Sequence, residues 1–210
     1  MLTMDLLDKE EIRNFIYDTS NKKLLIGSRR SGKTTSLLLA LARNCSNKKD
    51  YRPSTFIVES SMQIRSHYET LKTICNELGI NLTALRMTAN NEGICEIEGN
   101  KIKFVTSSRF NSLKGYKYKD TYIDEPNSIT NLNDVLDNAF YRTCSYNNPK
   151  LLIAGSSTVQ GEKLKNLSAD TSYSRHVINI ERYITNGQLE ELKNMMTTEQ
   201  FATEIQCKFV

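Results

Sequence analysis

A glycine-bounded loop between two apolar runs constrains this chain more than any other feature of its sequence. The segment reads LLIGSRRSGKTTSLLLA, in which the apolar run 24–28 leads into Gly27-x-x-x-x-Gly32-Lys33-Thr34. Glycines let the backbone curl, so that consecutive N–H groups can face an anion that also meets the positive end of the next helix. The pattern predicts a strand, a phosphate-binding loop and a helix, with a polyphosphate as ligand.

The individual positions of this loop have expected roles. Lys33 is expected to reach the β- and γ-phosphates of ATP, and the Thr34 hydroxyl is expected to hold Mg²⁺. A chance turn with a surface lysine would give the same letters, but the strand before it and the helix after it argue against that reading. The residues expected to contact the nucleotide are Gly27, Ser28, Arg29, Arg30, Ser31, Gly32, Lys33, Thr34 and Thr35.

Two adjacent carboxylates, Asp124 and Glu125, follow the short apolar run TYI. Neighbouring residues at a strand end point in different directions, so Asp124 can serve a metal while Glu125 faces a water in line with the γ-phosphorus. Such pairs also occur on exposed turns, so the order of elements matters: the loop, a strand and helix, this pair, and then a further strand. Hydroxyls after that strand are expected to sense the γ-phosphate: Ser156, Ser157 and Thr158.

Short apolar runs alternate with helical patterns along the whole chain. This alternation predicts an α/β fold with a mostly parallel sheet covered by helices on both faces. The expected strands are 24–28, 55–60, 102–107, 121–125, 151–157 and 176–180.

Local signals add detail to this outline. Apolar residues at helical spacing predict helices over 64–78 and 132–140, with Gly79 ending the first. The pair Gly99-Asn100 between two alternating runs predicts a hairpin. Thr197-x-x-Gln200 is typical of a capping box that opens a last helix.

Composition sets the class of protein. With 210 residues, 39% of them apolar, the chain can bury one core, so a single domain over 1–210 is expected. The net charge of +4 is too small for a protein that coats nucleic acid. Five cysteines without C-x-x-C spacing indicate reduced thiols and a cytoplasmic protein. No apolar run approaches the roughly 20 residues of a membrane span.

The chain resembles the ATPase domain of the large terminase subunit, the motor that packages DNA into the empty capsids of tailed bacteriophages and related viruses. The resemblance rests on GSRRSGKTT, MQIRSHYETLKTICNELGI, FNSLKGYKYKDTYIDEP, SSTVQG and EQFATEIQCKF. It implies a P-loop NTPase of the ASCE type that uses ATP and Mg²⁺ to move double-stranded DNA into viral procapsids in the host cytoplasm.

The same resemblance assigns roles to residues of this chain. Glu125 is similar to the family's catalytic glutamate, Asp124 to its metal-binding aspartate, and Thr158 or its neighbours to its coupling motif. Arg29 stands four residues before the loop lysine, where the family has an arginine that neutralises γ-phosphate charge. Arg30 is open to a second reading, as a surface residue unrelated to the nucleotide.

The resemblance also implies partners. These are a homo-oligomeric ring, often a pentamer, the portal or procapsid and the small terminase subunit, with no membrane. In such rings an arginine of one subunit completes the site of the next. Arg109 is the first candidate for this trans-acting role and Arg142 the second, although either can be an ordinary surface arginine.

The chain departs from the family pattern in three ways. It has no glutamine ahead of the loop for adenine recognition, and Glu59 stands where the family commonly has an arginine. The chain ends about where a linker to an RNase H-like nuclease domain would begin. We therefore expect no nuclease domain in these residues.

A basic stretch with interleaved tyrosines precedes Asp124. It can follow a DNA backbone without reading the bases, or it can be a solvated loop whose tyrosines pack on the domain. Its members are Arg109, Lys114, Tyr116, Lys117, Tyr118 and Lys119. His67 and His176 show no metal-ligand spacing and are expected to serve in packing.

Three other functions remain compatible with the motifs. One is a different ring or helicase-type P-loop ATPase. Another is a small-molecule kinase, which Glu125 beside Asp124 disfavours because a carboxylate there activates water. The third is a nucleotide-gated assembly module that binds ATP and scarcely hydrolyses it.

Overall fold

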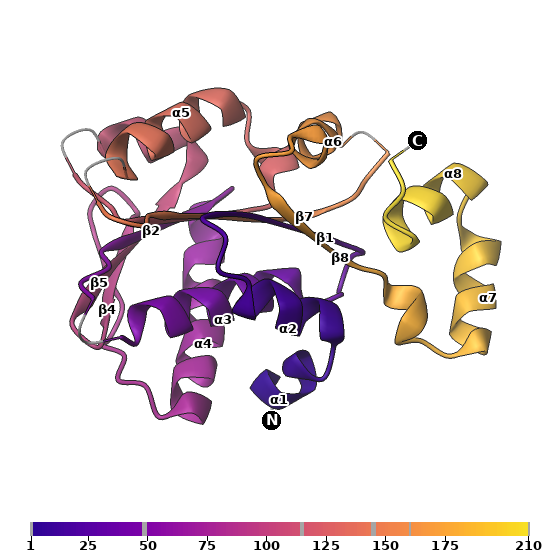
Figure 1. The fold of residues 1–210 in the computed structure, drawn as a ribbon, viewed down its shortest axis with the longest axis horizontal. Coiled ribbons are helices and arrows are strands. Elements are labelled where there is room, and N and C mark those ends of the chain that lie inside the picture. The colour runs from indigo at the N-terminus through magenta and orange to yellow at the C-terminus, as the bar shows by residue number, and fades with distance from the viewer. Residues whose placement is uncertain (1, 48–49, 114–115, 144–145, 160, 210) are drawn as a thin grey trace.

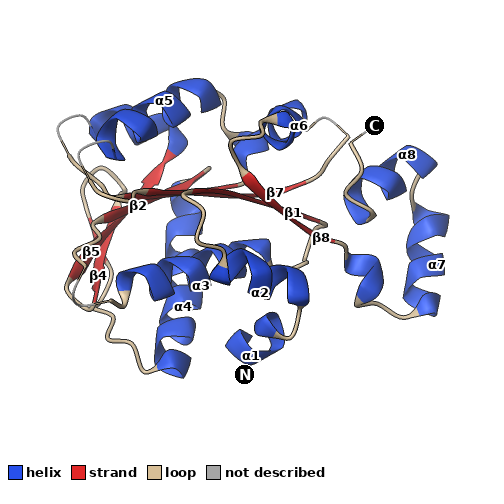
Figure 2. Cartoon of the chain, viewed as in Figure 1, coloured by secondary structure: helices blue, strands red, loops and turns tan. Residues whose placement is uncertain are grey.

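One sheet organises the molecule (Figures 1 and 2). The computed structural model describes residues 2–47, 50–113, 116–143, 146–159 and 161–209, without the side chains of 111–113, 140, 142 and 143. Within these residues eight strands lie in the order β3-β4-β5-β2-β6-β7-β1-β8. They are β1 (Lys22–Gly27), β2 (Ser54–Val58), β3 (Arg86–Met87), β4 (Gly93–Ile97), β5 (Asn100–Thr106), β6 (Asp120–Asp124), β7 (Lys150–Ser156) and β8 (Ser174–Ile178).

In the order of the sheet, the six neighbouring strands β5, β2, β6, β7, β1 and β8 pair in parallel. At the other end, β4 pairs antiparallel with both β3 and β5. Helices α1 to α4 cover one face of the sheet, and α5 and α6 cover the other (Figure 1). The predicted fold class is therefore confirmed. The helices are α1 (Leu2–Leu7), α2 (Glu10–Tyr17), α3 (Lys33–Cys45), α4 (Ser61–Leu78), α5 (Leu132–Thr143), α6 (Glu162–Ala169), α7 (Asn186–Met195) and α8 (Thr198–Gln200).

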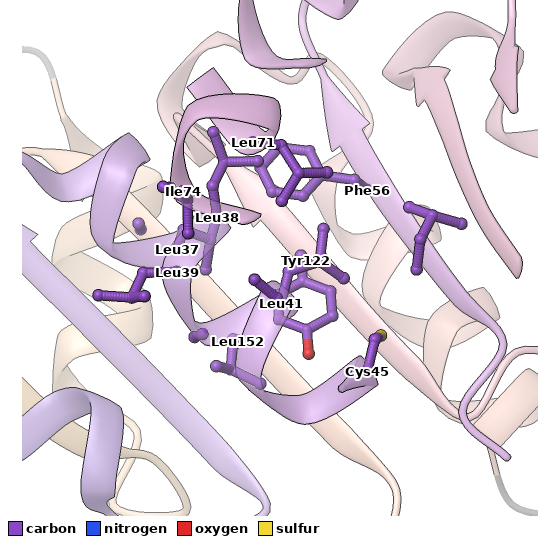
Figure 3. Packing of buried hydrophobic residues seen from close by; sticks show 14 of the residues in the cluster. Leu37, Leu38, Leu39, Leu41, Cys45, Phe56, Leu71, Ile74, Tyr122 and Leu152 are labelled. Atoms are coloured by element: carbon purple, nitrogen blue, oxygen red, sulfur yellow. The ribbon is translucent and has the colours of Figure 1, made fainter. Parts of the chain in front are cut away.

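Covering both faces makes the central strands apolar on both sides. In β1, Leu25 packs with the core under α3 and α4, whereas Leu24 and Ile26 pack with the core under α5 and α6. This is the alternation that a strand buried on both faces requires. Figure 3 shows leucines of α3 gathered with Phe56 and Tyr122 of the sheet. The leucine-rich run after the loop is thus explained by burial.

The six predicted strands and the two helices predicted from apolar spacing are all present, with bounds that differ by at most three residues. Gly79 ends α4 with a left-handed φ of 65°, as predicted. The hairpin is also present, but its two turn residues are Glu98 and Gly99, with φ of 48° and 83°. Asn100 pairs with Ile97 in the ladder, so the predicted turn was one residue too late.

The capping box at Thr197 and Gln200 is confirmed, and its helix α8 continues as a π-helix over Phe201–Ile205. The two-residue strand β3 was not predicted from the sequence. None of the described helices combines the length and apolar character that crossing a membrane demands.

A buried ion pair joins neighbouring segments at the amino ends of the strands. Arg52 Nη1 lies 2.9 and 3.0 Å from the two carboxylate oxygens of Asp120, which is fully buried. Asp120 Oδ1 also accepts the backbone N–H of Lys150 at 3.0 Å. One carboxylate therefore connects the start of β6 to the start of β7 and to the segment before β2.

Replacing Asp120 by Ala is expected to lower the free energy of unfolding by about 3–5 kcal/mol. The buried Arg52 loses its contact with Asp120 and keeps the pairing of its Nε with Asp50, and the Lys150 N–H loses its acceptor. Urea denaturation measures this loss. Glu190→Ala is the control, since its i,i+3 pair with Lys193 is exposed; we expect a change below about 0.5 kcal/mol. Equal losses in the two variants would contradict the assignment.

Candidate nucleotide-binding site

The carboxyl ends of three neighbouring parallel strands meet at one edge of the sheet. Gly27, at the end of β1, lies in register with Ser156, at the end of β7. Asp124, at the end of β6, lies in register with Ala154 of β7. Because β7 lies between β1 and β6, its Ser156 stands between the glycine loop and the two carboxylates. Ligands in open α/β sheets bind at such carboxyl ends.

The loop runs from β1 into the first turn of α3, which begins at Lys33. Gly32 has φ of +95°, and a Cβ there would come within 2.8 Å of the Leu6 Cδ2 atom. Lys9 Nζ donates to the carbonyl of Ser31 at 3.3 Å. The loop is thus shaped by a glycine-only conformation and supported from below by the N-terminal helices.

Lys33 is 5% exposed, and its Nζ donates to the carbonyl of Ser28 at 2.6 Å. Burial lowers the pKa of Lys33, and the carboxylates of Glu125 and Asp124 oppose this shift. A partly desolvated ammonium gains more from an anion than one in water does. This lysine is therefore placed to bind a polyphosphate at the start of α3.

Thr34 and Asp124 are in direct contact. The Thr34 hydroxyl lies 3.1 and 3.0 Å from the two carboxylate oxygens of Asp124. A hydroxyl beside a carboxylate supplies the hard oxygen ligands that Mg²⁺ prefers. The described residues contain no cluster of three His, Cys, Asp or Glu side chains that could hold a metal alone. The pair fits a Mg²⁺ ion that is bound together with substrate phosphates.

Glu125 has a left-handed backbone, with φ of 51°. Its carboxylate accepts hydrogen bonds from the Ser156 backbone N–H at 2.9 Å and the Ser156 hydroxyl at 2.6 Å. Its own N–H donates to the carbonyl of Ala154 at 2.8 Å. A non-glycine residue in this conformation is strained by about 1–3 kcal/mol, and such strain gathers at functional sites. The turn directs Glu125 and Asp124 to different partners, as predicted for adjacent carboxylates.

Lys33, Thr34, Glu125 and Ser156 line a cavity of about 590 Å³, whereas Asp124 is not among its lining residues. Its walls carry the positive charges of Arg29, Arg30 and Lys33 and the negative charges of Glu59 and Glu125. Such a lining suits a highly charged anion accompanied by a divalent cation. The lining residues are Arg29, Arg30, Gly32, Lys33, Thr34, Thr35, Glu59, Glu125, Asn127, Ser128, Ser156 and Thr158.

Several predicted site residues lie beneath this cavity or outside it. The Ser28 hydroxyl points away and donates to the carbonyl of Ile205 at 2.9 Å, and Gly27 is the last residue of β1. The hydroxyls of Ser31 and Ser157 are buried and have no hydrogen-bond partner among the described atoms. Of the three hydroxyl residues predicted at the end of β7, Ser156 and Thr158 line the cavity and Ser157 does not.

Arg29 lines the cavity with a side chain that is 73% exposed, and its Nε lies 3.9 Å from Glu204 Oε2. Arg109 is exposed in the 3-10 turn Ser107–Leu113, which follows β5 at the same edge of the sheet. It is not among the residues that line the cavity of its own chain, and its role on a neighbouring subunit stays a prediction. The side chain of Arg142 lies outside the described residues.

The predicted basic stretch is only partly a surface. Lys119 is buried and forms an ion pair with Asp50, and the Tyr118 side chain is buried as well. Their burial argues against a DNA contact by these two residues, and Tyr118 agrees with the alternative in which a tyrosine of the stretch packs on the domain. Both residues were drawn into the core because they lie directly before β6. Tyr116 and Lys117 are exposed, and Lys114 lies outside the described residues.

Two further residues take part in the site, and sequence reasoning missed both roles. Asn127 donates from Nδ2 to the Ser156 carbonyl at 3.0 Å and accepts the backbone N–H of Leu164 at 3.0 Å. His67, expected to serve in packing, also contacts the Asp124 carboxylate. The helical spacing around His67 indicated burial, but no local signal pointed to a partner in a distant strand.

The family model described as "Terminase large subunit, T4likevirus-type, N-terminal" matches residues 24–159. These residues contain the loop, both carboxylates and the end of β7. None of the curated protein sequences matches the chain significantly.

Several solved structures share the fold. The large terminase from a thermophilic bacteriophage, in complex with ADP, has a TM-score of 0.73 at 14% identity, over 96% of this chain and 53% of that chain. The Thermus phage P74-26 large terminase ATPase domain has a TM-score of 0.67 at 13% identity, over 99% and 97%. The HK97 bacteriophage large terminase has a TM-score of 0.59 at 12% identity, over 95% and 50%. The chain thus spans about half the length of the first and the last of these three proteins.

Gly32→Ala is expected to weaken nucleotide binding by at least about tenfold, because its left-handed backbone and the contact with Leu6 both oppose a Cβ. Titration with a fluorescent ATP analogue measures this effect. Gly99→Ala is the matched control: it has φ of +83° and nothing within 4 Å of the added Cβ. It should cost about 1–2 kcal/mol of stability and leave nucleotide affinity unchanged. Equal affinities in the two variants would contradict the loop assignment.

Proposed function

Because the chain belongs to the T4likevirus-type terminase large-subunit family, which residues 24–159 match, we propose that it is a Mg²⁺-dependent ATPase. We further propose that its turnover drives double-stranded DNA into a viral procapsid in the host cytoplasm. The observation that carries the proposal is the meeting of Lys33, Thr34, Asp124 and Glu125 at one edge of the sheet.

Binding of the triphosphate is assigned to the loop and the first turn of α3. The N–H groups at the start of a helix have no partners within it and favour an anion. Lys33 would exchange its bond to the Ser28 carbonyl for phosphate oxygens, and this exchange restores an ionic partner to a buried ammonium. Arg29 and Arg30, on the cavity wall, would neutralise the remaining charge.

Thr34 and Asp124 would hold Mg²⁺, since their oxygens already face one another at hydrogen-bond distance. When bound, Mg²⁺ neutralises charge on the β- and γ-phosphate oxygens. Asp124 is buried, so the protein fixes its carboxylate in place before any ligand arrives. This preorganisation lowers the cost of assembling the site.

Glu125 is the proposed general base. It would take a proton from water while the water oxygen forms a bond to the γ-phosphorus. The bond between the γ-phosphorus and the oxygen that joins it to the β-phosphate breaks, and its electron pair leaves on ADP. The two hydrogen bonds from Ser156 now occupy its carboxylate, so catalysis requires the glutamate to release at least part of this contact. Ser156 is thus the residue most directly coupled to the state of the catalytic base.

A chain of hydrogen bonds leads from this base to α6. Ser156 contacts Glu125, its carbonyl accepts from Asn127 Nδ2, and Asn127 Oδ1 accepts the Leu164 N–H. A movement of Ser156 would therefore be felt in the first turn of α6. This route is our proposal for how hydrolysis is transmitted out of the site.

The proposed partners are duplex DNA, the procapsid portal, the small terminase subunit and further copies of this chain in a ring. Support comes from the family match and from the position of Arg109, which is exposed at the active edge but lies outside its own cavity. A nucleotide-gated module with little ATP turnover would use the same loop. The following experiment distinguishes such a module from an ATPase.

Glu125→Gln is expected to reduce ATP turnover by about 10²–10⁴-fold, because it removes the proton acceptor, while ATP affinity changes by less than a few-fold. Steady-state phosphate release and nucleotide titration measure the two quantities. Glu59→Gln is the matched control, since Glu59 lines the same cavity without contacting Ser156 or Asp124. A turnover equally low in wild type and Glu125→Gln would favour the gating module.

Arg109→Ala is expected to reduce DNA- and procapsid-stimulated ATPase activity by about 10³–10⁵-fold if it acts across the ring, as trans arginines do in other NTPases. Activity of the isolated chain should stay unchanged, because the residue is absent from its own cavity. Lys72→Ala is the control, since Lys72 is an exposed lysine of α4 that lies outside the basic stretch and the cavity. Unchanged stimulation in the Arg109 variant would exclude it as the trans residue.

A further inference from the structure

A histidine that the proposed reaction does not use contacts the proposed metal ligand. His67, in the middle of α4, is 8% exposed, and its Nε2 lies 2.8 Å from Asp124 Oδ2. The same carboxylate also accepts the Thr34 hydroxyl, which lies 3.1 Å from Oδ1 and 3.0 Å from Oδ2. Asp124 is therefore held by one group from α3 and one from α4.

The position of His67 is itself fixed by its surroundings. The capping box of Ser60 and Gln63 sets the start of α4 directly after β2. The His67 ring packs edge-on against Phe56 of β2, with ring centroids 5.6 Å apart and an interplanar angle of 78°. Few rotamers satisfy both the ring contact and the contact with the carboxylate.

The chemistry of the contact indicates which nitrogen of His67 carries the proton. An ionised carboxylate only accepts hydrogen bonds, so His67 donates from Nε2. One lone pair of Oδ2 is then occupied, and both carboxylate oxygens also lie within hydrogen-bond distance of the Thr34 hydroxyl. Groups that orient a metal-binding side chain in this way tune metal affinity.

We propose that His67 is a positioning residue that orients the Asp124 carboxylate for Mg²⁺. This inference rests on the proposed Mg²⁺-dependent nucleotide binding and adds to it a role for α4. His67 does not touch the nucleotide. It acts through Asp124, and without it the Asp124 carboxylate keeps its contact with the Thr34 hydroxyl but loses its contact with α4.

The chain contains a second histidine with nearly the same surroundings. His176 Nε2 lies 2.8 Å from Asp18 Oδ2, and its ring packs against Phe15 at 5.6 Å and 78°. His176 belongs to β8 and is paired with Leu25, in the middle of β1, away from the strand ends that form the site. The two pairs therefore match in geometry and differ in what the carboxylate faces.

The experiment measures nucleotide affinity at increasing Mg²⁺ concentration, and again in EDTA, for His67→Leu, His67→Gln, His176→Leu and His176→Gln. Leucine keeps the bulk and removes the donor, whereas Gln returns an Nε2 donor. Mg²⁺ is expected to increase the nucleotide affinity of the wild type. We expect the His67→Leu variant to need a Mg²⁺ concentration about 10–100-fold higher to reach half of this increase, while its nucleotide affinity in EDTA equals that of the wild type. His67→Gln should recover part of the loss.

Both His176 variants should keep the wild-type Mg²⁺ dependence, even where they lower stability in urea denaturation. Long-range ¹H–¹⁵N NMR of the wild type should show His67 in the Nε2–H form, and Asp124→Asn should alter its Nε2 signal. A wild-type Mg²⁺ dependence in His67→Leu, or an Nδ1–H form of His67, would overturn the proposal. A wild-type protein that binds nucleotide equally well with and without Mg²⁺ would instead remove the proposed metal site, and the role of His67 with it.

Discussion

The backbone hydrogen bonds that hold β7 between β1 and β6 determine everything else at the site. They place Ser156 opposite Gly27 and Ala154 opposite Asp124, so that the loop, the hydroxyl and the carboxylates lie within two residues of one another along β7. A slip of one residue would turn Ser156 to the opposite face and end its contact with Glu125. Gly155 allows the tight packing beyond this point, because a Cβ there would come within 2.7 Å of Pro126.

The same arrangement holds buried charges, strained backbone and unpaired hydroxyls at the site, and each of these features lowers the stability of the fold. Lys33 and Asp124 are buried, Arg30 and Glu125 have left-handed backbones, and Ser31 and Ser157 bury hydroxyls that lack partners among the described atoms. Each feature costs on the order of 1–3 kcal/mol. The two large apolar cores on the faces of the sheet offset these costs. The apolar cores beside the site thus stabilise the fold, and the groups of the site remain available for an anionic ligand.

Sequence reasoning located the elements because their signals are local: apolar runs, the glycine loop and the capping boxes lie within a few residues. It misplaced the hairpin turn because Glu98 accepts a left-handed φ that the pattern assigns to glycine or asparagine. It could not choose among the hydroxyls after β7, since the choice depends on strand register. It read His67 as a packing residue because its partner lies 57 residues away in the chain. Contacts of this kind appear only when the sheet order is known.

The glycine loop between β1 and α3 also contacts segments near both ends of the described chain. Leu6 of α1 packs under Gly32, and the Ser28 hydroxyl bonds to the carbonyl of Ile205 at the end of the π-helix. Cys207, with φ of 57°, turns the chain there and donates from Sγ to the Ile178 carbonyl at 3.5 Å. A change in the loop must therefore be accommodated by these two segments as well as by Ser156. Because packed interfaces shift between discrete arrangements rather than stretch, any rearrangement of the loop would have to break or remake these contacts.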